Sequence, residues 1–268
     1  MSGLHLVTGG SGYFGSVLVQ KLKAQGESVR VFDLHRPDQA PEGIEVMQGD
    51  IRDKGAVRAA VCGADFIHHN VAQVPLAKDR QLFWSVNLDG TENLLAAAEV
   101  ERVKKVVYTS SSAVFGVPAR NPVDDTVPPR PQEEYGRAKL AGEDRCRAYA
   151  SRGLDVSIVR PRTIMGHGRL GIMQILFEWV REGRPLPVLG GGENRYQFVH
   201  ADDLADACLK AAARPGPATY NIGAERFGTM RELLEGLAAH AGTGSRVVSV
   251  PMAPAVAAMR VALSLIHI

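Results

Sequence analysis

The sequence of 268 residues has only three cysteines, and no two of them are spaced as a CxxC pair. Cys62, Cys146 and Cys208 are scattered, which excludes a disulfide framework and a zinc site of that type and indicates buried thiols in a reducing compartment. Basic residues form no block, and the net charge is only +2. We therefore expect no nucleic-acid partner.

A long apolar run is also missing. Residues 251–268, PMAPAVAAMRVALSLIHI, are nearly all apolar, but Arg260 interrupts them before the ~20 residues that cross a bilayer. They suggest a packed C-terminal helix, yet the pattern stops without a cap, so we expect a truncated reading frame in which 264–268 is not native. The chain starts directly in a strand, which leaves no room for a signal peptide. We expect a cytoplasmic protein without a membrane partner and without a bound metal.

Glycine is concentrated near the N-terminus, in LHLVTGGSGYFGS at 4–16. An apolar run precedes the glycines, and apolar residues at helical spacing follow them, so the glycines lie where a strand turns into a helix. Backbone N–H groups and the helix dipole at such a turn can hold a pyrophosphate. Glycine there allows a sharp turn and close approach of the backbone to the phosphates.

A second apolar strand, 28–32, ends in Asp33, which lies 18 residues after Gly15. A dinucleotide-binding fold has a ribose-binding carboxylate at about this spacing. Asp33 is expected to accept hydrogen bonds from the adenosine ribose and to repel a 2′-phosphate, which favours NAD. His35 and Arg36 follow closely, and an arginine there could favour NADP instead.

Strands alternate with helices along the first half of the chain. Helices are expected at 13–25, 83–100 and 135–152, and further strands at 44–47, 64–68, 105–109 and 154–159, the last broken by Arg160-Pro161. This rhythm implies right-handed crossovers and a parallel sheet. The expected fold class is α/β, a Rossmann-type doubly wound parallel sheet with a smaller C-terminal substrate lobe.

The second half has a looser rhythm. It contains a glycine-rich flexible loop at 166–171, helices at 172–181 and 202–213, a Gly/Pro segment at 183–192 and a strand at 219–222. We expect two domains. Residues 1–165 form the NAD-binding domain with the active site, and 166–268 form a substrate-binding lobe, interleaved with the first domain and truncated.

Three residues near strand ends have more than one possible role. Asp50 could face the adenine or cap the next helix together with Asp53, and the sequence favours neither. His68 and His69 invite a metal hypothesis, but neighbours on a strand point to opposite faces. We expect both histidines to be packing residues.

Tyr135 and Lys139 are four residues apart on the expected helix and so share one face. Ser110-Ser111-Ser112 follows the preceding strand, on the same carboxyl edge. A free tyrosine has a pKa near ~10, which a nearby ammonium would lower. The phenolate could then remove a proton from a substrate alcohol while a serine hydroxyl holds the substrate oxygen.

These motifs resemble those of the extended short-chain dehydrogenase/reductases, the NAD-dependent epimerase/dehydratase group. TGGSGYFG at 8–15 matches TGxxGxxG, YGRAK at 135–139 matches YxxxK, and SSAVFG at 111–116 is similar to SSxxVYG. Asn87 with Gly90, Arg160-Pro161 and FVHADD at 198–203 also fall where the family has similar residues.

The resemblance implies NAD as the cofactor, a small-molecule substrate and a homodimer. Its implied catalytic residues are Ser111, Tyr135 and Lys139. Its implied cofactor contacts are Gly9, Gly12, Tyr13, Phe14, Gly15, Asp33, Asp50, Ile51, Val71, Ala72, Tyr135 and Lys139. Its implied substrate contacts are Ser111, Ser112, Arg162 and Arg195.

Departures from the family pattern bear on the substrate. Ser112-Ala113 stands where 4,6-dehydratases carry Asp-Glu, as in epimerases. Thr163 lies in the segment where nucleotide-sugar epimerases often have Asn, and Tyr196 replaces an Arg, with Arg195 shifted by one. The first hypothesis is a nucleotide-sugar 4-epimerase, similar to UDP-glucose 4-epimerase. The alternatives are an NAD(P)-dependent dehydrogenase or reductase of a sterol-like or other alcohol, and a cofactor-binding protein without catalysis.

Overall fold

The computed structural model describes residues 3–37, 42–73, 79–118, 120–168 and 173–252. The strands are β1 Leu4–Thr8, β2 Ser28–Asp33, β3 Glu45–Gln48, β4 Phe66–His69, β5 Lys105–Thr109, β6 Val156–Pro161, β7 Thr163–Met165, β8 Leu186–Leu189, β9 Phe198–His200, β10 Ala218–Ile222 and β11 Val247–Val250. The helices are α1 Tyr13–Ala24, α2 Lys54–Val61, α3 Arg80–Trp84, α4 Gly90–Val100, α5 Glu134–Ala150, α6 Gln174–Arg181, α7 Ala201–Ala213 and α8 Met230–Ala241. A π-helical turn, η1 Ser85–Asp89, joins α3 to α4, and a 3₁₀ turn, η2 Ser112–Phe115, follows β5.

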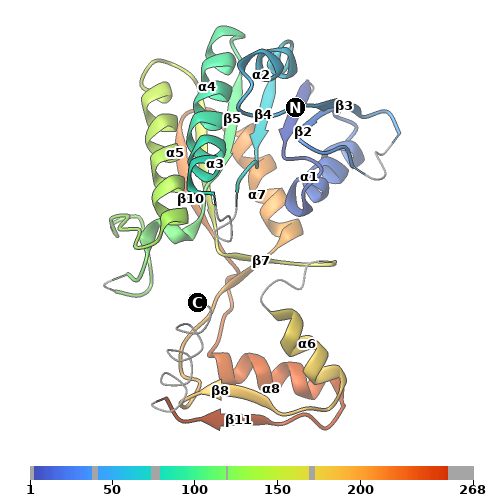
Figure 1. The fold of residues 1–268 in the computed structure, drawn as a ribbon, viewed down its shortest axis with the longest axis vertical. Coiled ribbons are helices and arrows are strands. Elements are labelled where there is room, and N and C mark those ends of the chain that lie inside the picture. The colour runs from blue at the N-terminus through green and yellow to red at the C-terminus, as the bar shows by residue number, and fades with distance from the viewer. Residues whose placement is uncertain (1–2, 38–41, 74–78, 119, 169–172, 253–268) are drawn as a thin grey trace. The chain divides into compact units, whose positions relative to one another are not determined.

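Seven strands form the main sheet in the order β10-β6-β5-β4-β1-β2-β3, and every neighbouring pair is parallel. The chain starts in the middle of the sheet, moves to one edge through β2 and β3, and returns to build the other edge from β4 onward (Figure 1). This is the doubly wound Rossmann arrangement, and it confirms the fold class expected from the sequence.

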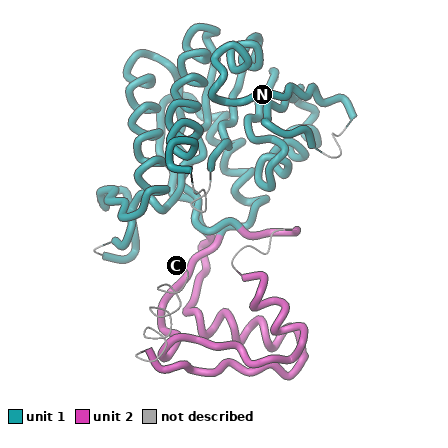
Figure 2. Tube along the Cα trace, in the orientation of Figure 1, with its two compact units in different colours: residues 1–164, 199–223 teal, residues 165–198, 224–268 magenta. Residues whose placement is uncertain are grey.

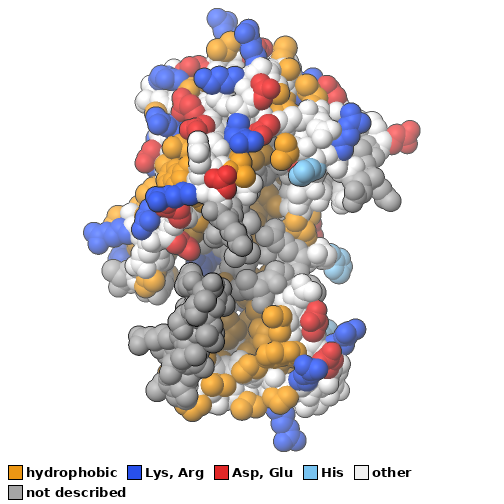
Figure 3. Space-filling model, viewed as in Figure 1, with side chains coloured by type: hydrophobic (Ala, Val, Ile, Leu, Met, Phe, Trp, Pro, Cys, Tyr) orange, Lys and Arg blue, Asp and Glu red, His pale blue; other side chains and the backbone are white. Residues whose placement is uncertain are grey.

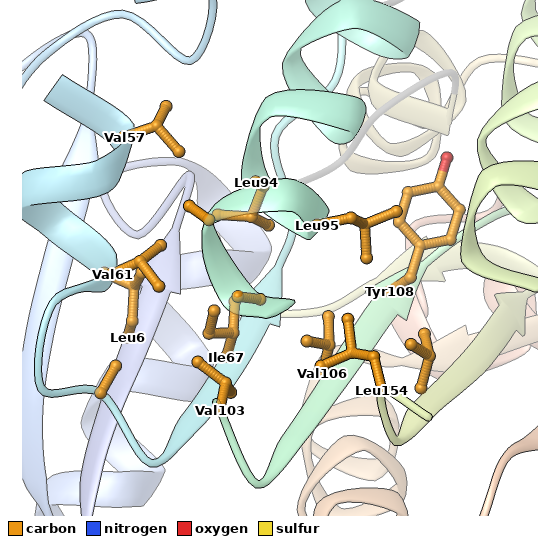
Figure 4. Close-up of a cluster of buried hydrophobic side chains, with 14 of the residues drawn as sticks. Leu6, Val57, Val61, Ile67, Leu94, Leu95, Val103, Val106, Tyr108 and Leu154 are labelled. Carbon is orange, nitrogen blue, oxygen red and sulfur yellow. The ribbon is translucent and has the colours of Figure 1, made fainter. Parts of the chain in front are cut away.

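One face of the sheet packs on α2, α4 and α5. Leu94 and Leu95 of α4 lie over Ile67 and Val106 of the strands, and all four side chains are buried (Figure 4). A parallel sheet is covered on both faces, so its strands are apolar on both sides. Strands β1, β4 and β5 are therefore buried along almost their whole length rather than on alternate residues.

The other face packs on α1 and α7. Leu18 and Leu22 of α1 and Leu204 of α7 are fully buried against Val7 and the strands beside it. Successive strand residues point to opposite faces, so Leu6 joins the first cluster and Val7 the second. Because all seven strands are parallel, their carboxyl ends lie at one common edge of the sheet.

Residues 165–198 and 224–268 form a separate compact unit (Figure 2). Among its described residues, α6 and α8 pack on the two-stranded parallel sheet of β8 and β11 around Leu186, Val188 and Leu234. Figure 3 shows hydrophobic side chains gathered on this unit, whereas acidic and basic side chains are interspersed over the first unit. Residues 199–223, with α7 and β10, belong to the first unit. The functional roles expected for the two domains stay predictions.

Most expected elements are present with bounds shifted by one or two residues, and three differ. Strand β6 runs through Arg160-Pro161 instead of breaking there. The expected Gly/Pro segment contains β8, and the helix expected at 83–100 is divided by the π-helical turn. None of the described helices is long and apolar enough to cross a membrane. All but the first two residues of the C-terminal helix expected at 251–268, the end at 264–268 expected not to be native, and part of the glycine-rich loop lie outside the described residues.

His68 and His69 are both almost fully buried, and each has a neutral hydrogen-bond partner. His68 Nε2 lies 3.2 Å from His5 Nδ1. His69 lies 2.7 Å from Thr8 Oγ1 and 3.1 Å from Thr91 Oγ1. Burial lowers the pKa of each to about 3, so both are neutral at pH 7. The histidines pack between strands and helices, and among the described residues no group of side chains could hold a metal ion.

Candidate functional site

The glycine turn between β1 and α1 has a geometry that larger residues would prevent. Gly9 has a φ of +71°, in the left-handed region, and its N–H donates to the carbonyl oxygen of Phe32 at 2.9 Å. A Cβ added at Gly15 would lie 2.0 Å from the carbonyl oxygen of Gly9. Glycine at 15 therefore lets α1 close directly onto the turn. The N-terminal amides of a helix at such a junction can hold an anion.

A cavity of about 480 Å³ opens beside this turn. Asp33 lines it, and its carboxylate accepts hydrogen bonds from the backbone N–H groups of Ser11 at 3.0 Å and His35 at 3.1 Å. The acid thus joins the glycine turn to the loop after β2. The expected cofactor residues that line the cavity are Gly9, Gly12, Asp33, Asp50, Ile51, Val71 and Ala72.

Tyr13, Phe14 and Gly15 do not line this cavity. Phe14 is 7% exposed and packs in the core on α1, and Gly15 acts through the close approach described above. Tyr13 and Phe14 pack on the hydrophobic core, and Gly15 contacts the backbone of the turn.

The two roles considered for Asp50 are separated in the structure. Asp53 alone caps α2, because its carboxylate accepts from the N–H groups of Gly55 and Ala56. Asp50 lines the cavity, and its carboxylate accepts from Arg52 Nε at 3.0 Å and from the guanidinium terminus at 2.5 Å. These hydrogen bonds from Arg52 lower the pKa of Asp50, which stays ionised.

The turn that follows Ser111 and the helix turn that carries Tyr135 approach each other closely through their backbones. Ser111 caps the turn η2, and its Oγ accepts from the N–H of Ala113 at 3.1 Å. Tyr135 is half-buried in the first turn of α5. A Cβ at the next residue, Gly136, would lie 2.4 Å from the carbonyl oxygen of Ala113. Glycine at 136 therefore lets the start of α5 contact the turn that Ser111 begins.

Lys139 lies one helical turn after Tyr135 and is only 3% exposed. Its Nζ donates to the carbonyl oxygen of Thr109 at 2.9 Å and lies 5.1 Å from the centre of the Tyr108 ring. Burial lowers the pKa of Lys139 to about 8, so the ammonium form still predominates at pH 7. A fixed positive charge therefore stands on the same helix face as Tyr135.

The two arginines expected to contact substrate lie in different compact units. Arg162, in the first unit, follows β6, and its guanidinium donates to Ser112 Oγ at 3.2 Å. Arg195, in the second unit, is exposed and forms an isolated backbone bridge with Thr229. The structure thus places Arg162 next to the serine segment, and the role of Arg195 stays a prediction.

Residues 5–223 match the model of the "NAD dependent epimerase/dehydratase family". The chain belongs to this family. The glycine turn, Ser111 and the Tyr135–Lys139 pair all fall within the matched segment.

Three curated relatives show how the family similarity extends. A protein of Sinorhizobium fredii, y4nG, is 56% identical over 97% of this chain and 66% of its own length. The UDP-glucose 4-epimerase of Mycolicibacterium smegmatis is 31% identical over 88% of this chain and 82% of its own. The 3 beta-hydroxysteroid dehydrogenase/Delta 5-->4-isomerase of Mycobacterium tuberculosis is 35% identical over 79% of this chain and 60% of its own. The chain thus spans about two thirds of the length of y4nG.

Solved structures of family members have the same fold. The UDP-glucose 4-epimerase of Thermus thermophilus, in complex with NAD, has a TM-score of 0.78 and 31% identity over 92% of this chain and 86% of its own. The UDP-glucose 4-epimerase of Thermotoga maritima, with UDP-glucose, has a TM-score of 0.82 and 26% identity over 92% of this chain and 85% of its own.

Two asparagines near the cavity were not among the expected contacts, the partly buried Asn70 and the buried Asn87. Asn70 lines the cavity, and its Oδ1 accepts from Thr109 Oγ1 at 2.7 Å. Asn87 lies in the π-helical turn and donates to the carbonyl oxygens of Phe83 and Gln73, while its own buried Oδ1 has no hydrogen-bond partner among the described residues. An unpaired buried acceptor is costly and often indicates a ligand contact. The sequence had shown Asn87 only as part of a family pattern.

A buried charge network that includes a residue of α5 was also not predicted from the sequence. Glu143 of α5 is fully buried, and its two carboxylate oxygens accept from Arg160 Nε at 2.8 Å and a terminal nitrogen of Arg160 at 2.6 Å. Ser110 Oγ and Arg147 donate to the same carboxylate, each at 2.6 Å. The network ties α5 to the ends of β5 and β6, next to Ser111. Burial of Arg160 in this pair also explains why β6 continues through Arg160-Pro161.

We predict that Glu143→Gln strongly destabilises the protein. The change keeps the side-chain volume but leaves the buried Arg160 guanidinium without its counter-charge, which typically costs roughly 3–5 kcal/mol. Arg147→Gln is the matched control, because it removes the more exposed partner and should cost about 1 kcal/mol or less. The measurement is urea unfolding of both variants. Equal, small losses for the two variants would contradict the structural role given to Glu143.

Proposed function

We propose that the protein is an NAD-dependent epimerase that acts on a nucleotide-sugar by transient oxidation of a sugar hydroxyl. The observation that carries this proposal is the contact between the start of α5 and the Ser111 turn, with Lys139 fixed one helical turn further on. The similarity of the fold to two UDP-glucose 4-epimerases supports a nucleotide-sugar, rather than another alcohol, as the substrate in this proposal. The second compact unit would supply the substrate-binding lobe, and a homodimer is part of the same proposal.

The residues around the cavity fit NAD. A Cβ at position 15 would fill the turn that keeps the amides of α1 open to a pyrophosphate, and Asp33 stands at the cavity with its carboxylate. When bound, NAD supplies a nicotinamide that accepts a hydride and returns it. Asn87, with its unpaired Oδ1, would serve as a further polar contact for the cofactor.

Tyr135 acts as the base in this proposal. The Lys139 ammonium stabilises the phenolate, which removes the proton from the substrate hydroxyl. Ser111 Oγ already accepts from the N–H of Ala113, so its own proton can be donated to the substrate oxygen. The same Tyr135 returns the proton when the ketone is reduced on its other face, which inverts the carbon.

A second candidate is a net NAD(P)-dependent dehydrogenase or reductase of a sterol-like or other alcohol. The 35% identity to the 3 beta-hydroxysteroid dehydrogenase favours it, as does the Arg160-Pro161 pair, which resembles the sterol and 3β-hydroxysteroid dehydrogenase branch of the family. Arg160, however, forms a buried ion pair with Glu143. The Arg160-Pro161 segment therefore supports α5 and does not indicate a particular substrate. Net consumption of added NAD separates the two candidates, because an epimerase regenerates its cofactor.

The test is incubation of the protein and NAD with UDP-, GDP- and dTDP-sugars, with analysis of product isomers and of NADH. We expect an isomer without net NADH.

Tyr135→Phe should lower turnover by ~10²–10⁴-fold, the usual contribution of a positioned acid–base group, while NAD binding is kept. Ser111→Ala should lower turnover more than Ser112→Ala. Near-normal turnover in Tyr135→Phe would eliminate the mechanism, and stoichiometric NADH would favour the dehydrogenase.

We further propose a preference for NAD over NADP, supported by Asp33. In this proposal the Asp33 carboxylate accepts hydrogen bonds from the adenosine ribose of NAD and repels the 2′-phosphate of NADP. Asp33→Asn should therefore weaken NAD binding and bring the dissociation constants of NAD and NADP closer together. Titration of the cofactor-free protein with NAD and with NADP measures both dissociation constants. Tighter binding of NADP by the unmutated protein would show that Arg36 or Arg52 governs this site instead.

A further inference from the structure

Arg162 is a half-buried cation beside the serine segment. One terminal nitrogen donates to Ser112 Oγ at 3.2 Å, and Ser112 directly follows Ser111, the expected hydroxyl contact of the reacting carbon. The Nε of Arg162 is buried and has no hydrogen-bond partner among the described residues. The guanidinium is therefore fixed at one nitrogen and unsatisfied at another.

Arg162 differs from the arginine two residues before it. Arg160 is neutralised by both oxygens of Glu143, whereas no carboxylate of the described chain forms an ion pair with Arg162. A guanidinium presents donors in a rigid planar fork that matches a carboxylate or phosphate. Removing it partly from water without a counter-ion costs free energy, which a bound anion would offset. The unmatched charge thus points to an anionic group on the ligand.

The position of Arg162 distinguishes between the anions of a nucleotide-sugar. The diphosphate is attached at C1, across the ring from the C4 hydroxyl on which Ser111 and Tyr135 would act. A carboxylate at C6 is two bonds from C4. A cation whose hydrogen-bond partner is the neighbour of Ser111 is therefore placed for a C6 carboxylate and not for the diphosphate.

We propose that Arg162 binds the carboxylate of the reacting sugar, so that the substrate is a nucleotide-linked uronic acid rather than a neutral hexose. This inference rests on the proposed function, since it takes Ser111 and Tyr135 as the groups that act on C4. Ser112 Oγ is the neutral hydrogen-bond acceptor that orients the Arg162 guanidinium.

The test compares UDP-glucuronic acid with UDP-glucose as substrates of the holoprotein and of Arg162→Gln. We expect the unmutated protein to bind and epimerise the acid about 10- to 100-fold more efficiently, the usual contribution of a hydrogen bond to a charged group. Arg162→Gln should lose this preference, so that its efficiencies with the two sugars become similar, and titration with NAD serves as the check on folding. Arg58→Gln, an exposed arginine of α2, is the control and should change nothing.

The outcomes separate the two proposals. Equal efficiency with both sugars, or an equal loss for both sugars and for NAD binding in Arg162→Gln, would overturn the carboxylate contact and leave the epimerase proposal standing. A C4 ketone beside a C6 carboxylate is a β-keto acid, which can lose CO₂. Release of CO₂ that depends on Arg162 would support the contact and overturn epimerisation. Loss of acid binding in Arg162→Gln, measured by titration without turnover, supports the contact whichever reaction follows.

Discussion

The parallel alignment of the seven strands of the main sheet is the constraint on which the site depends. Because every strand ends at the same edge, segments that are far apart in the sequence meet there. The glycine turn follows β1, Asp33 ends β2, Asn70 follows β4 and Ser110–Ser112 follows β5. Each lies at the end of its strand or directly after it, while the central strands are buried between the helices on the two faces of the sheet.

Helix α5, which carries the proposed catalytic pair, needs further stabilisation, because it brings Lys139 and Glu143 into the protein interior. The two residues lie one helical turn apart on the same face of α5. Lys139 donates to a backbone carbonyl of β5, and Glu143 accepts from Arg160 of β6 and from Ser110. The two glycines of α5 allow this depth, since a Cβ at Gly136 or at Gly142 would collide with η2 or with the Tyr108 hydroxyl. Close packing and buried charge pairing therefore fix Lys139 relative to the Ser111 turn.

The sequence predicted what depends on local pattern. The glycine turn, Asp33 and the apolar strands depend on neighbouring residues, and all lie where the pattern placed them. Contacts between distant residues could not be predicted. The sequence predicted a strand break at Arg160-Pro161, whereas the strand continues there because Arg160 pairs with Glu143, which lies 17 residues away on another element.

Two further differences have the same origin. Strand β8 was hidden by Pro187 and the surrounding glycines, but Pro187 is exposed beside Val248 in a two-stranded sheet, where a missing N–H costs little. The π-helical turn around Asn87 keeps the apolar spacing of an ordinary helix, so periodicity could not reveal it. Its unpaired Oδ1 was visible only once the partners of every buried polar atom were known.

The central claim is that Tyr135 removes a proton from oxygen while the hydrogen on the carbon leaves as hydride and returns. The most direct measurement uses the sugar found to be a substrate, labelled with deuterium on the carbon that inverts, in unlabelled water. The account predicts that the product isomer keeps the deuterium on that carbon through complete turnover. Replacement of the deuterium by solvent hydrogen would show that a proton is taken from carbon instead, and it would contradict the account.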